Sequence, residues 1–374
     1  MTKKTSLHGF GLFGDAASRQ TYAAGEVIFH TGDYADRMYV VVQGELLLTL
    51  HGSEIDRLTA GDLFGEMGMV ENRPRNGTVT AVSESTLIPI DRLRFATLVR
   101  QHPGFAMRVM TIMSARLRRR TELEVNRRAL ARELAIGRKM QLALLPQQVP
   151  QFPGWQFATH YESAWQVGGD FYDFIRPAED LHKLCLVIAD VTGKGVPAAL
   201  MMAVARTLIR AETGKGPSPA TVLQRVNELI LSDNRSPLFL SAFYAVLNIE
   251  KGALHYANGG HNPPLCLRWA SGKVEELSAQ GYLLGAFRGV SFSEEQTILG
   301  VGDALVLYTD GVNEARNAEG RFFGEERLRA AVVAAGDCNA QEIVQMIVTA
   351  VDNFTGSVDQ ADDLTILVVK RVAY

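Results

Sequence analysis

The chain carries, at residues 184–195, the sequence LCLVIADVTGKG. Its first six residues are all apolar, which predicts a strand that is buried on both faces. Asp190 follows this run directly and precedes a turn that contains Gly193 and Gly195. Asp310 stands in the same relation to the β-rich run 305–309. Two carboxylates are therefore expected where buried strands run into loops.

Two further acidic segments lie beside strands or glycines. Asp170 and Asp173 belong to the sequence VGGDFYDF at residues 167–174, and Asp362 and Asp363 directly precede the β-rich run 364–369. A single aspartate at a strand end is more often a turn former or a helix cap than a ligand. Four such positions, each beside glycine or another acid, favour one shared acidic site.

Charge decides what must accompany carboxylates that converge. Two of them about 5 Å apart repel by roughly 3 kcal/mol at an effective dielectric near 20. Lys194 is the main basic residue near these motifs. Divalent cations are the economical counter-charge, and oxygen ligands favour Mg²⁺ or Mn²⁺. Two such ions could activate a bridging water and hold phosphate oxygens during hydrolysis.

The region after Trp155 alternates apolar strand patterns with helical ones, which indicates a layered α/β sandwich. The strands are expected at 183–190, 242–249, 304–308 and 364–370, and the helices at 197–212, 219–231 and 341–354.

Five motifs in this region occur in the order found in SpoIIE-like PPM phosphatases, and the resemblance covers about residues 135–372. The motifs are VGGDFYDF (167–174), ADVTGKG (189–195), NGGHNPP (258–264), YTDG (308–311) and DDLT (362–365). The resemblance implies catalysis by Asp190 and Asp310. It also implies that Asp190 bridges two Mn²⁺ or Mg²⁺ ions, with the Val191 carbonyl, Asp170, Asp310 and Asp362 as further ligands.

Other polar residues of these motifs have less direct roles in the resemblance. Asp363 is expected to orient its neighbour, and Asp173 to serve structure. Eukaryotic relatives have a histidine, a possible proton donor to the leaving group, where this chain has Thr192. The general acid therefore stays open, with water, the substrate or His261 as alternatives. His261, in its glycine and proline setting, is more often a structural turn residue.

The region from about Tyr22 to Ile90 consists of short β-rich runs separated by glycine turns, which predicts a small β-roll. From about Asp91 to Leu145 the composition favours helix. The apolar stripe along this helix suggests pairing across a homodimer, although its heptad pattern is interrupted. The stripe consists of Leu117, Leu123, Leu130, Leu134, Met140 and Leu144.

The predicted roll contains GDLFGEMG at 61–68 and RPRNGTV at 73–79. Gly65 lets the backbone approach a ligand, and a helix starting at Glu66 presents N–H groups to an anion. Arg75 can pair with phosphate oxygens, and Glu66 with a ribose hydroxyl. These segments resemble the phosphate-binding cassette of cyclic-nucleotide-binding domains over about residues 12–120. Asn76 leaves cAMP or cGMP open, and a roll that binds nothing is the alternative.

Bulk properties exclude several classes. A net charge of −3 and a pI of about 6.3 give no global reason to bind nucleic acid or an anionic membrane. No apolar stretch approaches the roughly 20 residues of a spanning helix, so a cytoplasmic location is expected. The cysteines Cys185, Cys266 and Cys338 are widely spaced and are expected to be core thiols.

We therefore expect a sensor domain at 1–105, a helical linker at 106–146 and a phosphatase domain at 147–374. The predicted activity is metal-dependent hydrolysis of phosphoserine or phosphothreonine on a protein, regulated by cyclic nucleotide. The resemblance suggests an anti-sigma-factor antagonist as the phosphorylated substrate. A non-catalytic signalling scaffold is the alternative, and a transcription regulator is disfavoured because phosphatase motifs replace a DNA-binding segment.

Overall fold

The computed structural model describes residues 19–178, 180–216, 218–233 and 238–373. Contacts within the chain divide it into two units, Met1–Ala129 and Leu130–Tyr374. The division lies inside a helix, so the domain boundaries after residues 105 and 146 stay predictions. Residues 1–18 of the predicted sensor domain lie outside the described residues.

The first unit is a β-roll made of two four-stranded sheets, with strand orders β1-β8-β3-β6 and β2-β7-β4-β5. All pairs are antiparallel, and the glycine turns predicted from the sequence join several of them. The apolar runs fill two clusters, one around Met38, Leu63 and Phe105 and the other around Tyr39 and Phe64. The strands are β1 (Gln20–Tyr22), β2 (Val27–Phe29), β3 (Arg37–Gln43), β4 (Glu45–Leu50), β5 (Ser53–Thr59), β6 (Leu63–Phe64), β7 (Thr78–Ala81) and β8 (Ser85–Asp91).

Three helices accompany the roll, and the single helical run expected from 91 to 145 is in fact two helices. The helix α1 (Glu66–Glu71) begins where the sequence predicted it. The helix α2 (Arg92–Gln101) is capped by the Asp91 carboxylate and ends before His102. Pro103 disfavours helical backbone at the residue before it, so a new helix, α3 (Pro103–Leu144), begins there.

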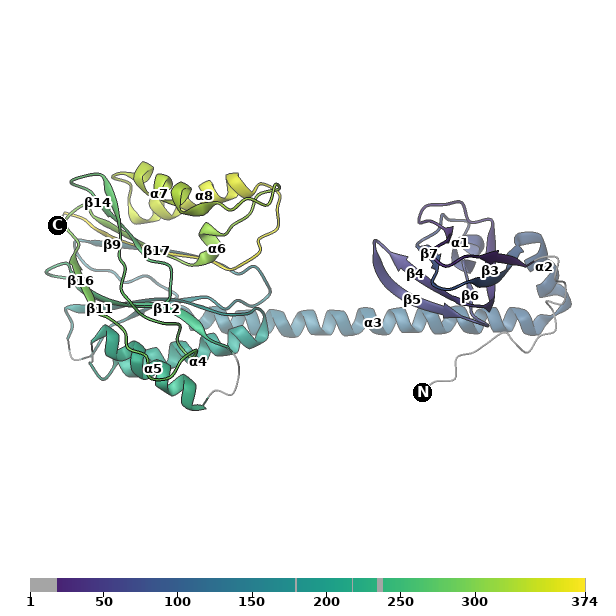
Figure 1. The fold of residues 1–374 in the computed structure, drawn as a ribbon, viewed down its shortest axis with the longest axis horizontal. Coiled ribbons are helices and arrows are strands. Elements are labelled where there is room, and N and C mark those ends of the chain that lie inside the picture. The colour runs from purple at the N-terminus through teal and green to yellow at the C-terminus, as the bar shows by residue number, and fades with distance from the viewer. Residues whose placement is uncertain (1–18, 179, 217, 234–237, 374) are drawn as a thin grey trace. The chain divides into compact units, whose positions relative to one another are not determined.

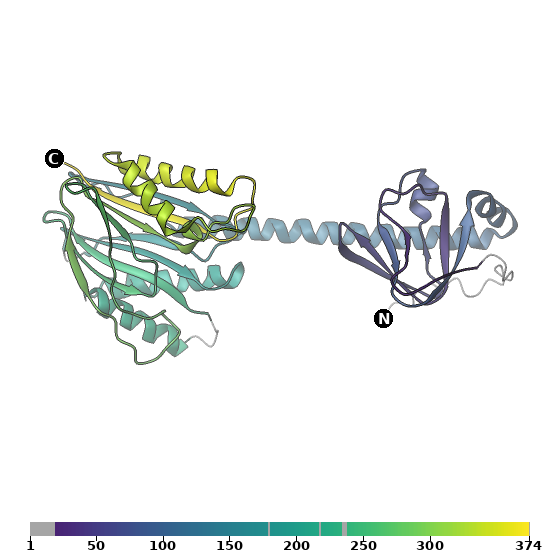
Figure 2. The same ribbon diagram turned by 45° about the horizontal axis from the view of Figure 1, so that its top comes forward.

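The second unit is an α/β sandwich of two five-stranded antiparallel sheets, ordered β10-β11-β12-β13-β16 and β15-β14-β17-β18-β9. The helices α4 and α5 cover the outer face of the first sheet, and α7 and α8 cover the second (Figures 1 and 2). The expected fold class is thus confirmed. The strands are β9 (Trp155–Glu162), β10 (Phe171–Ile175), β11 (Lys183–Val191), β12 (Leu240–Asn248), β13 (Ala253–Gly259), β14 (Leu265–Arg268), β15 (Lys273–Glu276), β16 (Glu295–Ile298), β17 (Ala304–Tyr308) and β18 (Leu364–Arg371). The helices are α4 (Val196–Thr213), α5 (Pro219–Asp233), α6 (Asp310–Asn313), α7 (Gly324–Ala335) and α8 (Ala340–Thr355).

The strand β11 lies between β10 and β12, with α4 over one face and the second sheet packed on the other, which explains its continuous apolar sequence. Its residues Leu184 to Ala189 are all buried in the main core. A second core packs α7 and α8 onto β17 and β18. Cys185 and Cys266 are core thiols as predicted, whereas Cys338 is only partly buried. No helix in the described ranges combines the length and apolar character that crossing a membrane would need.

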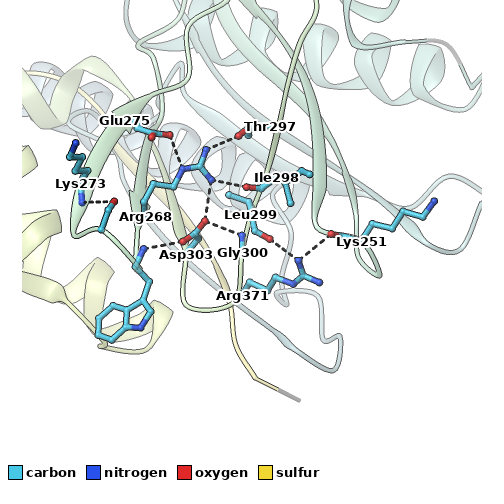
Figure 3. Close-up of polar contacts among 12 residues, drawn as sticks. Lys251, Arg268, Lys273, Glu275, Thr297, Ile298, Leu299, Gly300, Asp303 and Arg371 are labelled. Carbon is cyan, nitrogen blue, oxygen red and sulfur yellow. Dashed lines mark hydrogen bonds and ion pairs between the residues drawn. The ribbon is translucent and has the colours of Figure 1, made fainter.

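A polar cluster ties the two sheets of the sandwich together at one edge (Figure 3). The Arg268 guanidinium of β14 donates to the Glu275 and Asp303 carboxylates, and also to the Thr297 hydroxyl and the Ile298 carbonyl of the opposite sheet. Arg371, at the end of β18, donates to the Lys251 and Leu299 carbonyls, which lie next to β13 and β16 of the opposite sheet. These bonds limit sliding of one sheet over the other, on which the geometry of any site spanning both sheets depends.

Candidate metal centre

Asp190 lies near the end of β11, with Ser241 of β12 as its partner across the sheet. Burial raises the pKa of its carboxyl group to about 7, and repulsion from Asp310 adds to that effect. Asp362 and Asp363 raise it further, while a hydrogen bond with the Asp170 carboxyl group lowers it. Asp190 therefore lies within electrostatic reach of all the other candidate carboxylates.

Asp170 is the most deeply placed of these acids, with 1% of its surface exposed. One of its oxygens, Oδ2, accepts hydrogen bonds from the Thr309 and Thr365 hydroxyls, each at 2.6 Å. Burial raises the pKa of this carboxyl group well above its ordinary value, and Asp190 raises it again. The two threonines come from the ends of β17 and β18, so they anchor Asp170 to the opposite sheet.

Asp363 faces backbone amides. Its carboxylate accepts from the N–H groups of Ala164, at 2.9 Å, and of Gly169, at 2.6 Å, with a longer bond from Asp170. A Cβ atom at residue 168 would overlap the Asp363 carboxylate, and one at residue 169 would lie 2.8 Å from the Val191 carbonyl oxygen. The two glycines are therefore needed so that this loop can approach both groups.

Asp310 is the first residue of the short helix α6. Burial raises its pKa to about 6, and Asp362 and Glu314 raise it further while Lys194 lowers it. A Cβ atom at Gly311 would overlap the Asp363 carbonyl, so glycine allows α6 to pack on the 362–363 segment. Asp362 is half-exposed and forms a 2.9 Å ion pair with Lys194.

The fold thus brings the predicted metal residues Asp170, Asp190, Asp310 and Asp362 into one region, together with the Val191 carbonyl. Within the described ranges, however, no three His, Cys, Asp or Glu side chains stand as a ready-made set of metal ligands. Buried carboxylates that raise one another's pKa are the donor set that a hard dication would neutralise. The residues therefore fit Mg²⁺ or Mn²⁺.

Neither His261 nor Thr192, the residue that stands where eukaryotic relatives have a histidine, is poised to donate a proton at neutral pH. The Thr192 hydroxyl donates to the Phe239 carbonyl at 2.8 Å and accepts from the Phe239 N–H. His261 is buried, its Nδ1 lies 2.6 Å from the Ser241 hydroxyl, and burial lowers its pKa to about 4. These contacts give both residues a structural role beside the acidic region.

Asp173 and Gln141 connect two helices to β10 and to the loop that precedes it. The Asp173 carboxylate is paired with Arg206 and Arg210 of α4. Gln141, near the end of α3, donates to the Gly168 carbonyl at 2.5 Å and accepts from the Gly168 N–H at 3.0 Å. The sequence reasoning missed Gln141 because a glutamine on a helix is ordinarily solvated. The available signal in the sequence was the position of this polar residue directly before Leu142, Leu144 and Leu145, at the end of the predicted helix.

The roll brings together three of its four predicted nucleotide-binding residues. Gly65 has a positive φ of 75° and precedes α1, whose first residue, Glu66, is buried. Arg75 is 4% exposed and donates to the Gly65 and Arg37 carbonyls while stacking on Phe29. Its Nε is buried without a hydrogen-bond partner among the described residues, which fits an anion. Asn76 is exposed to solvent.

Comparison with known proteins places both units. Residues 180–372 match the family described as Stage II sporulation protein E, SpoIIE. Phosphoserine phosphatase RsbU of Bacillus subtilis is 30% identical over 239 residues, which is 64% of this chain and 70% of RsbU. The chain belongs to the SpoIIE family. Residues 19–102 match the cyclic nucleotide-binding domain.

Two further proteins are similar to this SpoIIE-family chain. Protein IcfG of Synechocystis sp. is 29% identical over 266 residues, 64% of this chain and 41% of IcfG. The SiaA-PP2C domain of Pseudomonas aeruginosa superposes with a TM-score of 0.58 at 23% identity, covering 66% of this chain and 98% of that domain, and it shows the shared fold. The predicted enzyme class, a protein serine/threonine phosphatase, is confirmed by family membership.

The first prediction concerns pH. Asp190 and Asp310 have pKa values of about 7 and about 6 in the folded chain, against 3.8 ordinarily. A raised pKa means that the protonated carboxyl groups stabilise the fold below pH 4, and that this contribution is lost as pH rises to about 7. We expect the melting temperature in EDTA to fall across this window and Mn²⁺ to reduce the fall. A Tm that does not change with pH in EDTA would contradict this.

The second prediction concerns Gln141. Replacing it with leucine leaves the N–H and carbonyl of Gly168 unpaired in a buried place, which loosens the loop that carries Asp170. We expect Gln141→Leu to lower kcat roughly tenfold and to weaken Mn²⁺ binding, measured by steady-state kinetics and calorimetry. Gln148→Leu, at an exposed glutamine just beyond the helix, is the control. Wild-type kcat and Mn²⁺ affinity in the Gln141 variant would refute the role.

Proposed function

We propose that this SpoIIE-family phosphatase hydrolyses phosphoserine or phosphothreonine on a signalling protein with two Mn²⁺ or Mg²⁺ ions held by Asp170, Asp190, Asp310, Asp362 and the Val191 carbonyl. The observation that carries the proposal is the mutual pKa elevation of buried carboxylates drawn from both sheets. Buried carboxylates with strongly shifted pKa values cluster at functional sites, where a bound cation can neutralise them. When bound, the two ions supply the positive charge that activates water and stabilises phosphate oxygens.

The chain's own residues hold that arrangement in place. Thr309 and Thr365 orient Asp170 by donating hydrogen bonds to its Oδ2. The Asp170 carboxyl group also forms a hydrogen bond with Asp190. Asp363 holds the amides of residues 169 and 170, so the loop cannot swing away from β18. Because the Thr192 hydroxyl is bonded to Phe239 and burial lowers the pKa of His261 to about 4, we infer that water or the substrate protonates the leaving group.

We propose a phosphorylated anti-sigma-factor antagonist as the substrate class. RsbU, which this chain resembles over 70% of its length, is a phosphoserine phosphatase. The cytoplasmic location expected from the sequence is the compartment where such a substrate would be met.

The third prediction tests the enzyme. We expect Mn²⁺-dependent release of phosphate from a phosphoserine peptide, abolished by EDTA and reduced at least about a hundredfold in Asp190→Asn, because one shared ligand of both ions is lost. Asp180→Asn, at an exposed aspartate before β11 that pairs with Lys183, is the matched control. Full activity in Asp190→Asn would contradict the role of Asp190 as a metal ligand, and absence of activity in the wild-type chain would leave the scaffold alternative.

We also propose that cAMP or cGMP binds the roll through Gly65, Glu66 and Arg75 and regulates the phosphatase. The buried, unpartnered Nε of Arg75 supports an anionic ligand, as does the family match of residues 19–102. The route to the catalytic unit would be α3, one helix whose start packs in the roll core and whose end holds Gly168. Exposed Leu130 and Met140 on α3 support pairing in a homodimer. Leu117 and Leu123 of the predicted stripe lie outside the described side chains.

The fourth prediction tests the sensor. Titrating cAMP and cGMP into the full chain should produce saturable binding and a change in kcat for one of them. Arg75→Met should weaken that binding at least about tenfold, since a charged hydrogen bond to phosphate is lost. Arg73→Met, at an exposed arginine two residues earlier, is the control. Absence of binding by either nucleotide would leave the roll as a docking module.

A further inference from the structure

Lys194 lies in the turn between β11 and α4, beside the acidic region. Its Nζ is 2.9 Å from the Asp362 Oδ2 and also donates to the Ala361 carbonyl. Among the described residues, Lys194 is the basic side chain that forms an ion pair with an acid of this region. The acids are Asp170, Asp190, Asp310, Asp362 and Asp363. A lysine thus supplies counter-charge to the candidate metal centre.

The same Asp362 carboxylate is a proposed metal ligand, so the lysine and a dication compete for it. An ammonium group held against a carboxylate that also binds a dication would be repelled by that ion. The Lys194–Asp362 pair therefore opposes binding of an ion through Asp362.

The displaced side chain has room to move on the solvent side. Lys194 and Asp362 are 43% and 45% exposed, whereas Asp170 is almost completely buried. The pair therefore lies at the rim of the acidic region, the side from which a phosphorylated protein must approach. Gly193 and Gly195 flank the lysine with positive φ values of 90° and 73°. These two glycines allow the positive φ values that the turn adopts, and the long flexible side chain of Lys194 can move its ammonium group.

We propose that Lys194 is a tethered cation with two successive partners: the Asp362 carboxylate before the ions bind, and the substrate phosphate afterwards. The inference rests on the proposed function. A lysine binds phosphate as a point charge, and at this rim it would contact an oxygen that the ions do not hold. Lys194 then lowers metal affinity and raises phosphate affinity.

These opposite signs make the test specific, because general damage to the fold would weaken both kinds of binding. Lys194→Met removes the charge with little change in length, and Lys194→Arg keeps it. Lys183→Met is the matched control, since Lys183 is also half-exposed and paired with an aspartate, Asp180, before β11. Mn²⁺ affinity is measured by calorimetry on the full chain, and phosphate affinity as competitive inhibition by inorganic phosphate of phosphopeptide hydrolysis.

We expect Lys194→Met to bind Mn²⁺ about three- to tenfold more tightly, because breaking a half-exposed ion pair no longer opposes binding. Its inhibition constant for inorganic phosphate should rise about tenfold, with a matching rise in KM. Lys194→Arg and Lys183→Met should stay within about twofold of wild type in the phosphate measurement. Unchanged or weaker Mn²⁺ binding in Lys194→Met, or an unchanged inhibition constant, overturns the inference.

The wild-type measurements separate this inference from the proposed function. Mn²⁺ binding and Mn²⁺-dependent hydrolysis by the wild-type chain support the metal centre whatever Lys194 does. If the wild type binds no Mn²⁺ by calorimetry, the metal centre itself fails and the role of Lys194 is overturned with it.

Discussion

The convergence of like charges is the constraint on which the catalytic unit depends. Asp170, Asp190 and Asp310 each have a pKa raised first by burial and then by another carboxylate. A fold gathers such groups only if neighbouring donors offset part of the cost. Here the donors are two threonine hydroxyls for Asp170, the amides of residues 169 and 170 for Asp363, and the Lys194 ammonium for Asp362.

Each of these donors depends on the packing of two separate sheets. Asp190 comes from the end of β11, while Thr309 and Thr365 come from β17 and β18 in the other sheet. Gly169 and Gly311 let their loops approach the Val191 and Asp363 backbone carbonyls, and Gly168 leaves room for the Asp363 carboxylate. The Arg268 cluster at another edge of the sandwich holds the sheets in register. The sandwich therefore acts as a frame for charges that would otherwise move apart.

The roll shows a related use of a buried charge. Arg75 is enclosed beside Phe29, and burial lowers the pKa of its guanidinium group. Two backbone carbonyls satisfy part of the guanidinium, and its Nε remains as a donor. In both units, buried charged groups suit a ligand of opposite charge. In the roll, the Arg75 guanidinium suits an anion, and in the sandwich, the carboxylates suit a cation.

Much of the fold could be predicted from patterns within short segments. The strand β17 was predicted at its observed bounds, and β11, α4, α5, α8 and β18 within two residues, because continuous apolar runs and helical periodicity are local signals. The strands β9, β10 and β13 to β16 and the helix α7 were not predicted, since their short or mixed sequences become strands or helices only through their neighbours. The break between α2 and α3 at His102 has a local signal, because Pro103 disfavours helical backbone at the residue before it.

The sequence by itself determined the motif order, and with it the SpoIIE-like resemblance, the acidic positions and the nucleotide-binding segments. Only the tertiary structure decided which partners those residues have. Asp363 faces backbone amides, Gln141 holds Gly168, Lys194 pairs with Asp362, and Asn76 is exposed while Arg75 is buried. The reason is that these contacts join residues up to 199 positions apart. Their existence depends on sheet packing and burial, which no local pattern encodes.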